Sequence, residues 1–495
     1  MKKFISVICA AAMLFSLCLT AHGANAMKNS EQRGLHVEQD GSITLEGKPF
    51  YGFGVNYYGA YARYAEAEGQ PEEQFKAGIA GLASYNIPFI RMPLCAYYPS
   101  YYEMYDNDPE KLFSYMKKVL DECEKNHIGV IGSLMWWVSV IPAHLKAKRA
   151  DMGVIGSEVL EYAKKYTADV VSRFADHPAI WGWEIGNEYN LEADLCDRNL
   201  KMFLWPEGIP GMPLDDVNGY DYFTSEELAV FYAEIAKVIR EYDGYRLITT
   251  GNGEMRPSAY ALYKSGQKKD KNHVWDLRWD GSTLKQFEKM NEIYNPDPID
   301  TLCFHLQSGS FDGSKKYVME FNVFGKTLSS EEYFRAYYDV AKKLGKACFF
   351  GEFGDMLEME TAPDVIEKFR EVTDAISASG IQIAALWQFQ DYTDEGVAGQ
   401  KLAVLSELNK KLVADGKQQT EEAWKEREEI TETETVTETE QISEEITQKP
   451  EDEKKTEKKT NVVPYIIAAA AAAAVCAAVI VIIKKKSLKD KKVEE

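Results

Sequence analysis

The chain of 495 residues lacks the cysteine pattern of a disulfide-rich or zinc-binding protein. Of its eight cysteines, Cys9 and Cys18 fall in an apolar leader and Cys476 in an apolar run near the C-terminus. The other five are odd in number, and no two form a C-x-x-C pair. These spacings argue against a disulfide framework and against a structural zinc site. We expect neither a metal nor a cofactor.

An excess of basic residues is also missing. The 57 Lys and Arg face 78 Asp and Glu, which gives a formal net charge of −21 at pH 7. Nucleic acids attract positively charged surfaces, so this balance argues against DNA or RNA as a partner.

No glycine-rich phosphate loop follows the first predicted strand. Gly52-Phe-Gly54 lies inside that strand and is too short for a dinucleotide-binding fingerprint. A doubly wound open sheet is therefore the second choice of fold.

What the chain does have at its two ends are export and anchoring signals. Two lysines at positions 2–3, an apolar run over 4–19 and small residues at 24–26 predict a signal peptide over 1–26. Residues 462–483 are 22 uncharged residues, long enough to span a bilayer, and lysines 484–486 follow at once. The positive-inside rule then places 484–495 in the cytoplasm. We expect a single-pass protein of the cell membrane with its bulk outside the cell.

An acidic segment, 417–461, separates the predicted span from the rest of the chain. Its first 44 residues contain 15 acidic and 8 basic side chains and little apolar surface to bury. Such a segment is predicted to be a disordered, self-repelling spacer, with a binding role as the alternative. The folded domain is expected over 35–416.

Within that domain, apolar runs of strand length alternate with helical patterns. This alternation predicts a parallel sheet with helices outside it, an α/β protein. Two helices open with capping boxes, Thr224-Ser-Glu-Glu227 and Ser329-Ser-Glu-Glu332. Eight strands, each followed by a helix, predict a (β/α)₈ TIM barrel. The predicted strands are Phe50–Val55, Pro88–Pro93, Gly129–Met135, Ala179–Ile185, Arg246–Thr250, Thr301–His305, Ala347–Gly351 and Ile383–Gln388.

Two further features refine the barrel. The turn Asp40-Gly41 between Leu35–Val37 and Ser42–Leu45 predicts an N-terminal hairpin that plugs the lower end. The long insertions follow strands rather than helices, so they crowd the face where TIM-barrel enzymes keep their catalytic groups. They are Tyr189–Phe223, Asn252–Gly281 and Leu306–Leu328.

Two of the apolar runs end in a glutamate. The fourth strand leads to Asn187-Glu188, and the seventh leads to Glu352. In a closed barrel the ends of these strands face each other across the mouth. A structural ion pair is the alternative for either acid alone, but two facing carboxyls near Tyr and Trp indicate glycoside hydrolysis.

With these motifs, the chain resembles the retaining (β/α)₈ glycoside hydrolases, most closely glycoside hydrolase family 5, the cellulase and mannanase family. The resemblance extends over residues 35–390. It implies an O-glycosyl hydrolase, an endo-β-glycanase or β-glycosidase, that cleaves β-linked oligo- or polysaccharides such as β-mannan or β-glucan. The motifs that carry it are Gly54-Val-Asn56, Ile90-Arg91-Met-Pro93, Trp183-Glu-Ile-Gly-Asn187-Glu188, His305, Gly351-Glu352-Phe-Gly354 and Trp387.

The resemblance implies that Glu188 is the general acid/base and Glu352 the nucleophile. A nucleophile should stay ionised, and Arg91 is placed to stabilise its charge, with a buried salt bridge as the alternative role for this arginine. The acid needs a raised pKa, which the negative neighbour supports. A spacing of about 5–5.5 Å between the carboxyls indicates retention, and one of about 8–9 Å indicates inversion.

The substrate-binding residues are implied in the same way. Asn187 would donate to the sugar 2-hydroxyl, His305 would orient the acids, and Trp387 would floor the subsite at the cleavage point. The last two have a core position as their alternative. Asn56 and Trp136 complete the set, each either at the sugar or in the packed interior.

The chain departs from the family pattern at two places. Gln307 stands where an aromatic is common, and the third strand ends in Ser133-Leu-Met-Trp136-Trp137 without a histidine. These departures concern the subfamily and the sugar. Two other functions stay open: a catalytically silent sugar-binding surface protein, and a membrane-anchored adhesive protein that uses the barrel as a scaffold.

Overall fold

Eight parallel strands close into a barrel in the computed structural model, which describes residues 33–65, 71–95, 99–194, 223–266, 281–307, 320–354, 363–390 and 396–418. These residues all belong to one compact unit, Met1–Lys425. The strands follow one another around the ring in chain order, and the last pairs with the first. They are β4 (Gly52–Asn56), β5 (Phe89–Pro93), β6 (Gly129–Met135), β7 (Ile180–Gly186), β8 (Leu247–Thr249), β9 (Thr301–Gln307), β12 (Ala347–Gly354) and β13 (Ile383–Leu386).

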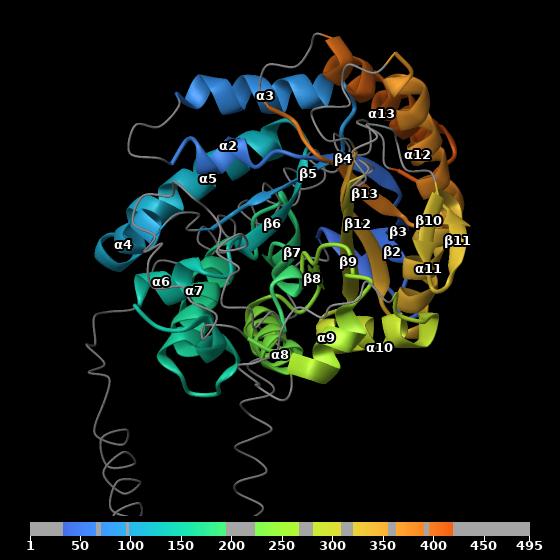
Figure 1. Cartoon of the computed structure of the whole chain (residues 1–495). Helices are drawn as coiled ribbons and strands as arrows, with labels where there is room; N and C mark the ends of the chain where they lie inside the picture. Colours follow the sequence, from blue (N-terminus) through green and yellow to red (C-terminus); the bar gives the residue numbers. More distant parts are fainter. Residues whose placement is uncertain are drawn as a thin grey trace, which may run out of the picture. The chain divides into compact units, whose positions relative to one another are not determined.

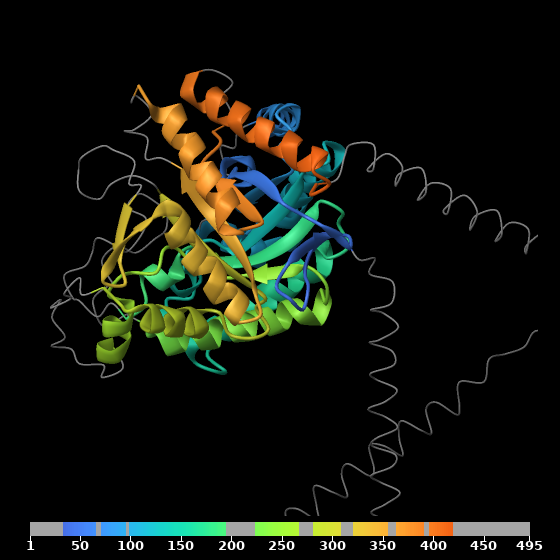
Figure 2. The same cartoon turned by 90° about the vertical axis from the view of Figure 1, so that its right-hand side faces the viewer.

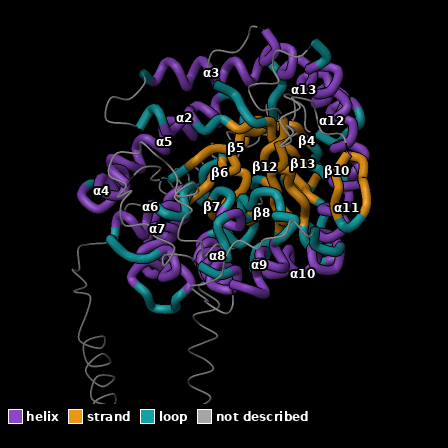
Figure 3. Tube along the Cα trace, in the orientation of Figure 1, coloured by secondary structure: helices purple, strands orange, loops and turns teal. Residues whose placement is uncertain are grey.

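Helices surround this barrel, as Figures 1 and 3 show. All eight predicted strands and the eight helices expected between and after them are present, with ends that differ by a few residues. The predicted (β/α)₈ barrel is therefore confirmed. The covering helices are α3 (Glu72–Ser84), α5 (Pro109–Lys125), α7 (Glu158–Phe174), α8 (Ser225–Tyr242), α10 (Leu284–Tyr294), α11 (Ser330–Lys343), α12 (Val365–Ser379) and α13 (Gly396–Ala414).

Local capping explains where two of these helices begin. In α8 the Thr224 hydroxyl accepts from the Glu227 amide at 3.2 Å, and the Glu227 carboxylate accepts from the Thr224 amide at 2.8 Å. Ser329 and Glu332 form the same reciprocal pair at α11. Each box satisfies two backbone N–H groups that the helix leaves unpaired. Both predicted capping boxes are confirmed.

An N-terminal sheet closes one end of the barrel. Its strands are β1 (Leu35–Val37), β2 (Ile43–Leu45) and β3 (Lys48–Pro49), one more than the predicted hairpin. The sheet appears in dark blue beside the strands in Figure 2. Its apolar side chains join a second core cluster made of inward-facing residues of the lower barrel, among them Phe89, Trp181 and Phe349. The predicted plug is therefore present.

The other elements all lie in connections that follow a barrel strand. This confirms that the insertions gather at the carboxyl ends of the strands. They are α2 (Gly59–Ala62), α4 (Pro99–Asn107), α6 (Val140–His144), the 3₁₀ turns η1 (Arg149–Gly153) and η2 (Tyr189–Leu191), α9 (Ala259–Gly266), and the antiparallel pair β10 (Glu320–Val323) and β11 (Lys326–Ser329).

Four predicted segments lie outside the described residues. They are the signal peptide, the acidic linker from residue 419 onward, the membrane span and the basic tail. Among the residues described, no helix combines the length and apolar character needed to cross a membrane.

Candidate active site

Strand register brings the predicted site residues to one end of the barrel. Asn56 on β4 pairs in register with Arg91 on β5, and Glu352 on β12 pairs with His305 on β9. Glu188 follows β7 by two residues, and its amide donates to the Gly251 carbonyl at 2.8 Å just after β8. Because parallel strands all point the same way, these carboxyl ends share one rim.

A register shift in β12 turns Glu352 into the barrel. Phe350 pairs with Phe304, but the next pair is Glu352 with His305, so Gly351 is an extra residue. Strict alternation after the inward-facing Phe349 would have put position 352 outside. The shift reverses the alternation, which is what a β-bulge does. A Cβ at position 351 would lie 2.6 Å from His305 Nε2, so a glycine is needed here.

A second register shift, in β7, turns Glu184 into the barrel. Val130 pairs with Ile180, and the next residue of β6 pairs with Gly182. Trp181 joins the lower barrel cluster, while the Trp183 ring packs outward and donates from Nε1 to Asp243 at 2.8 Å. Glu184 then points inward again.

The guanidinium of Arg91 is the centre of the site. It is fully buried, and donates to Glu184 at 2.6 and 2.8 Å and to Glu352 at 2.8 Å. It also donates to the amide oxygens of Asn56 at 2.8 Å and Asn187 at 2.7 Å. A buried cation requires such pairing because its desolvation costs several kcal/mol. Arg91 therefore combines the two alternatives, since the contact with Glu352 is itself part of a buried salt-bridge network.

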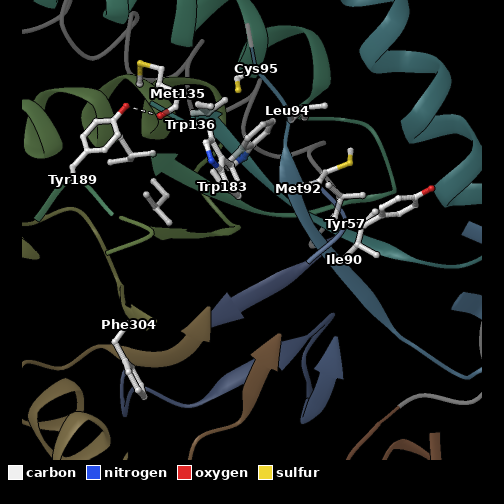
Figure 4. Packing of buried hydrophobic residues seen from close by; sticks show 14 of the residues in the cluster. Tyr57, Ile90, Met92, Leu94, Cys95, Met135, Trp136, Trp183, Tyr189 and Phe304 are labelled. Atoms are coloured by element: carbon white, nitrogen blue, oxygen red, sulfur yellow. Dashed lines mark hydrogen bonds between the residues drawn. The ribbon is translucent and has the colours of Figure 1, made fainter. Parts of the chain in front are cut away.

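Asn56 and Trp136 lie in the packed interior behind the acids, the alternative place given for both, and a role of either in substrate binding stays a prediction. Asn56 is fully buried, and its Nδ2 donates to the Gly351 carbonyl at 2.9 Å. The Trp136 ring is 2% exposed, lies among the buried residues drawn in Figure 4, and holds the Arg91 guanidinium 4.7 Å from its centroid. Both residues hold Arg91 in place, because an amide oxygen and a π-face both attract a cation.

Glu188 and Glu352 meet at His305. His305 is buried, and its Nδ1 lies 3.1 Å from Glu188 Oε1 and 3.5 Å from Glu352 Oε1. One carboxylate oxygen of each acid and one imidazole nitrogen lie within 4.8 Å of one another. The side chain of Glu188 is 35% exposed and that of Glu352 only 4%. The three groups form one cluster with Glu188 at its open side.

The pKa shifts of the two acids are opposite to those expected, which were a raised pKa for Glu188 and an ionised Glu352. Burial raises the pKa of Glu188, but the hydrogen bond and charge of His305, with the charges of Arg91 and Arg256, outweigh it and lower the pKa. Burial raises the pKa of Glu352, and the negative charge of Glu188 adds to it against His305 and Arg91. Arg91 thus favours the ionised form of Glu352, as expected, without overcoming burial.

Half-buried aromatic rings lie beside the acids. The Trp387 indole is stacked on Tyr58, with centroids 6.0 Å apart and an interplanar angle of 11°. The Trp387 amide donates to the Phe353 carbonyl at 2.7 Å, next to Glu352 in β12. The peptide bond between Trp387 and Gln388 is cis. Both rings are partly exposed, and the Arg63 guanidinium lies 5.4 Å from the Tyr58 centroid.

Three tyrosines in the connections after β4 and β5 lie in the core. Tyr57, Tyr101 and Tyr102 are at most 2% exposed. Trp137 is half-buried, and the tyrosines at 97 and 98 lie outside the described residues.

Three groups of side chains have the composition of a metal site among the described residues. One is Glu188, His305 and Glu352, whose atoms already bond to one another or to Arg91. A second, Glu184, Cys303 and His305, is buried beside it, and Glu184 is already paired with Arg91. The third is Asp121, Glu124 and His177 on the outside of the barrel. The expectation of a metal-free reaction stays a prediction.

Sequence reasoning missed Glu184 and Asn190. The signal for Glu184 was available: a lone acid in an otherwise apolar buried strand needs a cation, and Arg91 stands in another such strand. Asn190 resembled an ordinary loop residue, and nothing in the sequence indicated its contacts with the connection after β8.

Comparisons with known proteins agree with this geometry. The family model described as cellulase (glycosyl hydrolase family 5) matches residues 45–393. An endo-1,4-β-mannanase from Rhizomucor miehei matches in structure with a TM-score of 0.52 and 14% identity, over 76% of this chain and 99% of its own. An exo-β-1,4-mannosidase from Opitutaceae bacterium strain TAV5 matches with a TM-score of 0.50 and 16% identity, over 77% of this chain and 63% of its own.

A search of curated proteins gave no match. Identities this low show the shared fold, and the family model covers most of the chain. The chain belongs to glycosyl hydrolase family 5, and is a glycosidase.

Proposed function

We propose that this glycosidase cleaves β-linked glycans with retention of configuration, by double displacement. The observation that carries the proposal is the spacing of the acids, since carboxylate oxygens of Glu188 and Glu352 lie within 4.8 Å. Retaining enzymes hold their carboxyl groups about 5–5.5 Å apart, whereas inverting enzymes leave about 6.5–9.5 Å for a water. The spacing favours retention.

Glu352 is the proposed nucleophile and Glu188 the proposed acid/base. In the first step a Glu352 oxygen bonds to the anomeric carbon, the glycosidic bond breaks, and the Glu188 proton moves to the leaving oxygen. In the second step Glu188 takes a proton from water, whose oxygen bonds to the anomeric carbon and releases the Glu352 carboxylate. This division follows exposure, because the acid must reach a leaving group on the open side of the cluster.

Substrate binding supplies the protonation states that the mechanism needs. A sugar above the site covers the Glu188 side chain, which is 35% exposed, and adds little to the burial of Glu352, which is 4% exposed. Loss of solvent disfavours a charged carboxylate, so binding raises the pKa of Glu188 selectively. Glu188 then holds the proton, and Glu352 is ionised beside Arg91.

Two neighbours complete the subsite at the cleavage point. Arg91 donates to Asn187 Oδ1, which turns Nδ2 away from Arg91 and leaves it to donate to the sugar 2-hydroxyl. The half-buried Trp387 ring, which stacks on Tyr58, is the proposed floor for the apolar side of a pyranose.

β-1,4-Mannan is the first substrate class to test, with β-glucan second. The two solved structures described above are named for a mannanase and a mannosidase. The first products of mannan hydrolysis show whether the enzyme cleaves within the chain or from its end.

The central test is Glu352→Gln. The variant should keep the far-UV circular dichroism of the wild type and lose hydrolysis of β-mannan and β-glucan by at least about 1,000-fold, because it removes the nucleophile. Glu371→Gln is the matched control and should hydrolyse normally, because this partly exposed residue of α12 pairs with Lys368 of the same helix. Near-wild-type hydrolysis by Glu352→Gln would contradict the assignment.

Product stereochemistry tests the mechanism separately. Proton NMR of the first product should show the β-anomer, whereas an α-anomer indicates inversion. Glycan binding without any release of reducing ends favours the silent sugar-binding alternative.

The proposal extends to location: a protein exported and tethered to the cell membrane by residues 462–483. Gln418 donates to the Tyr51 carbonyl just before β4, at the end of the barrel opposite the acids. The described part of the chain therefore ends at the end of the barrel opposite the acids. The full chain should sediment with membranes, and a chain ending at residue 461 should be released. Equal distribution of the two would contradict the anchor.

A further inference from the structure

Glu188 lies beyond the end of its strand and needs support from its neighbours. Its backbone is left-handed, with φ 58° and ψ 26°. This conformation costs a residue with a side chain about 1–2 kcal/mol, so surrounding contacts must stabilise it. The contacts that do so determine where the carboxyl group points.

One contact comes from the following residue. The Tyr189 hydroxyl donates to the Met135 carbonyl at the end of β6, the dashed line in Figure 4. The ring is 2% exposed and stacks on Tyr232 of α8. This contact holds the chain after Glu188 on the β6 side.

The contact on the β8 side is reciprocal. Asn190 Nδ2 donates to the Gly253 carbonyl at 3.1 Å, and the Gly253 amide donates to Asn190 Oδ1 at 2.8 Å. We call this pair the Asn190 clip. The Asn190 side chain is 3% exposed and uses both a donor and its acceptor, so its orientation is unambiguous. Next to it, the Arg256 guanidinium donates to the Leu191 carbonyl at 3.0 Å.

The clip lies directly against the acid. A Cβ added at Gly253 would be 3.0 Å from Glu188 Oε1 and 3.2 Å from its Cγ. The backbone that Asn190 holds is therefore the wall behind the Glu188 carboxyl group. If the clip opens, the wall and the loop that carries Glu188 can move apart. A displacement of about 1 Å of a catalytic group can cost about 100-fold in rate.

We propose that Asn190 is a positioning residue for Glu188: its two hydrogen bonds to Gly253 hold the proton donor in line with the leaving oxygen. The inference rests on the proposed function, because it assigns Glu188 that role. Asn190 touches no reacting atom and acts only through the acid.

Leaving groups of different acidity separate positioning from general damage. Phenyl β-mannobioside needs protonation of its leaving oxygen, whereas 2,4-dinitrophenyl β-mannobioside leaves readily without it. In Asn190→Ala the kcat/KM should fall about 100-fold for the phenyl substrate and less than about 5-fold for the dinitrophenyl one. Asn190→Ser, which can keep one hydrogen bond, should fall between wild type and Asn190→Ala.

The chain offers a matched control in Asn409 of α13. This buried asparagine forms the same reciprocal pair with Phe53, with hydrogen bonds of 2.9 and 3.0 Å, away from Glu188. Asn409→Ala should lower the melting temperature at least as much as Asn190→Ala, because Asn409 also donates to the Asn86 carbonyl at 3.0 Å and accepts from Gln418 at 3.1 Å. In Asn409→Ala the kcat/KM values for the phenyl and the dinitrophenyl substrate should change by the same factor.

The outcomes are distinct. Equal losses on both substrates in Asn190→Ala and Asn190→Ser would overturn the positioning role. A wild-type enzyme inactive on these mannobiosides and on the corresponding aryl β-cellobiosides would contradict the proposed function, and the clip is then tested by amide hydrogen exchange. Exchange at Gly253 should accelerate in Asn190→Ala and not in Asn409→Ala. An unchanged rate would overturn the clip itself.

Discussion

The charge of Arg91 is shared between two buried carboxylates, Glu184 and Glu352. Only part of it stabilises the ionised form of Glu352, which explains why burial still raises the pKa of that acid. From sequence, Arg91 and Glu352 could be paired because both stand at strand ends. The lone acid Glu184 in an apolar strand signalled a cationic partner, but the register shift in β7 that turns it toward Arg91 could not be read from the sequence.

Glu254 is a second residue whose environment sets its titration. It is a half-buried acid in the connection after β8, it accepts from the Tyr333 hydroxyl at 2.9 Å, and burial raises its pKa from 4.5 to about 7.

The raised pKa of Glu254 predicts a loss of stability as pH rises. The folded protein binds this proton more tightly than the unfolded chain, so the loss begins near pH 4.5 and levels off above about pH 7. Glu254→Gln should reduce the decline in unfolding free energy between these values by about 1–3 kcal/mol, measured by urea denaturation at each pH. Glu407→Gln, at an exposed position, should leave the decline unchanged. An unaltered decline in Glu254→Gln would contradict the prediction.

Among the elements, helix starts were predicted from the sequence more accurately than turns. The capping boxes at Thr224 and Ser329 are local, so four residues suffice to recognise each one. The β10–β11 hairpin was missed because its turn is Phe324-Gly325, with φ of 55° and 74°. Such turns are usually recognised by Asn-Gly or Asp-Gly, and an aromatic residue in the left-handed region carries no comparable signal.

The connection after β8 depends on Gly251. Its φ is +69°, and a Cβ there would lie 2.0 Å from the Gly186 carbonyl and 2.6 Å from Glu184 Cδ. Gly251→Ala should lower the unfolding free energy by about 3–5 kcal/mol, because it adds backbone strain and a clash. Gly156 is the matched control: its φ is +80° and its Cβ would meet nothing within 4 Å, so Gly156→Ala should cost about 1–2 kcal/mol. Equal losses in urea unfolding would show that the close approach to β7 is not costly.

At the scale of the whole molecule, contacts that stabilise the fold and the residues proposed for catalysis lie at opposite ends of the barrel. At the lower end Gln382 accepts from the Ile43 amide at 2.7 Å and donates to the Ile43 and Phe50 carbonyls at 2.9 Å each. The acids and Arg91 lie at the other end.

Gln382→Ala should therefore affect stability alone. Removing the hydrogen bonds of Gln382 to the Ile43 amide and the Phe50 carbonyl should cost about 1–3 kcal/mol and lower the melting temperature. The pH profile of kcat/KM should match that of the wild type, because no group near Glu188 or Glu352 changes. A displaced profile would show that the two ends are coupled.

The barrel, the plug at its lower end and the two acids at the ends of its fourth and seventh strands could be predicted from the sequence. These follow from apolar runs, turn residues and caps, which act over a few neighbouring positions. The folded structure was needed to see that Glu184 shares Arg91, that Asn56 and Trp136 lie behind the acids, and that Asn190 bonds to Gly253 beside Glu188. Those contacts join residues far apart in the chain, and the one between Glu184 and Arg91 also depends on a one-residue register shift that reverses which side chains face inward.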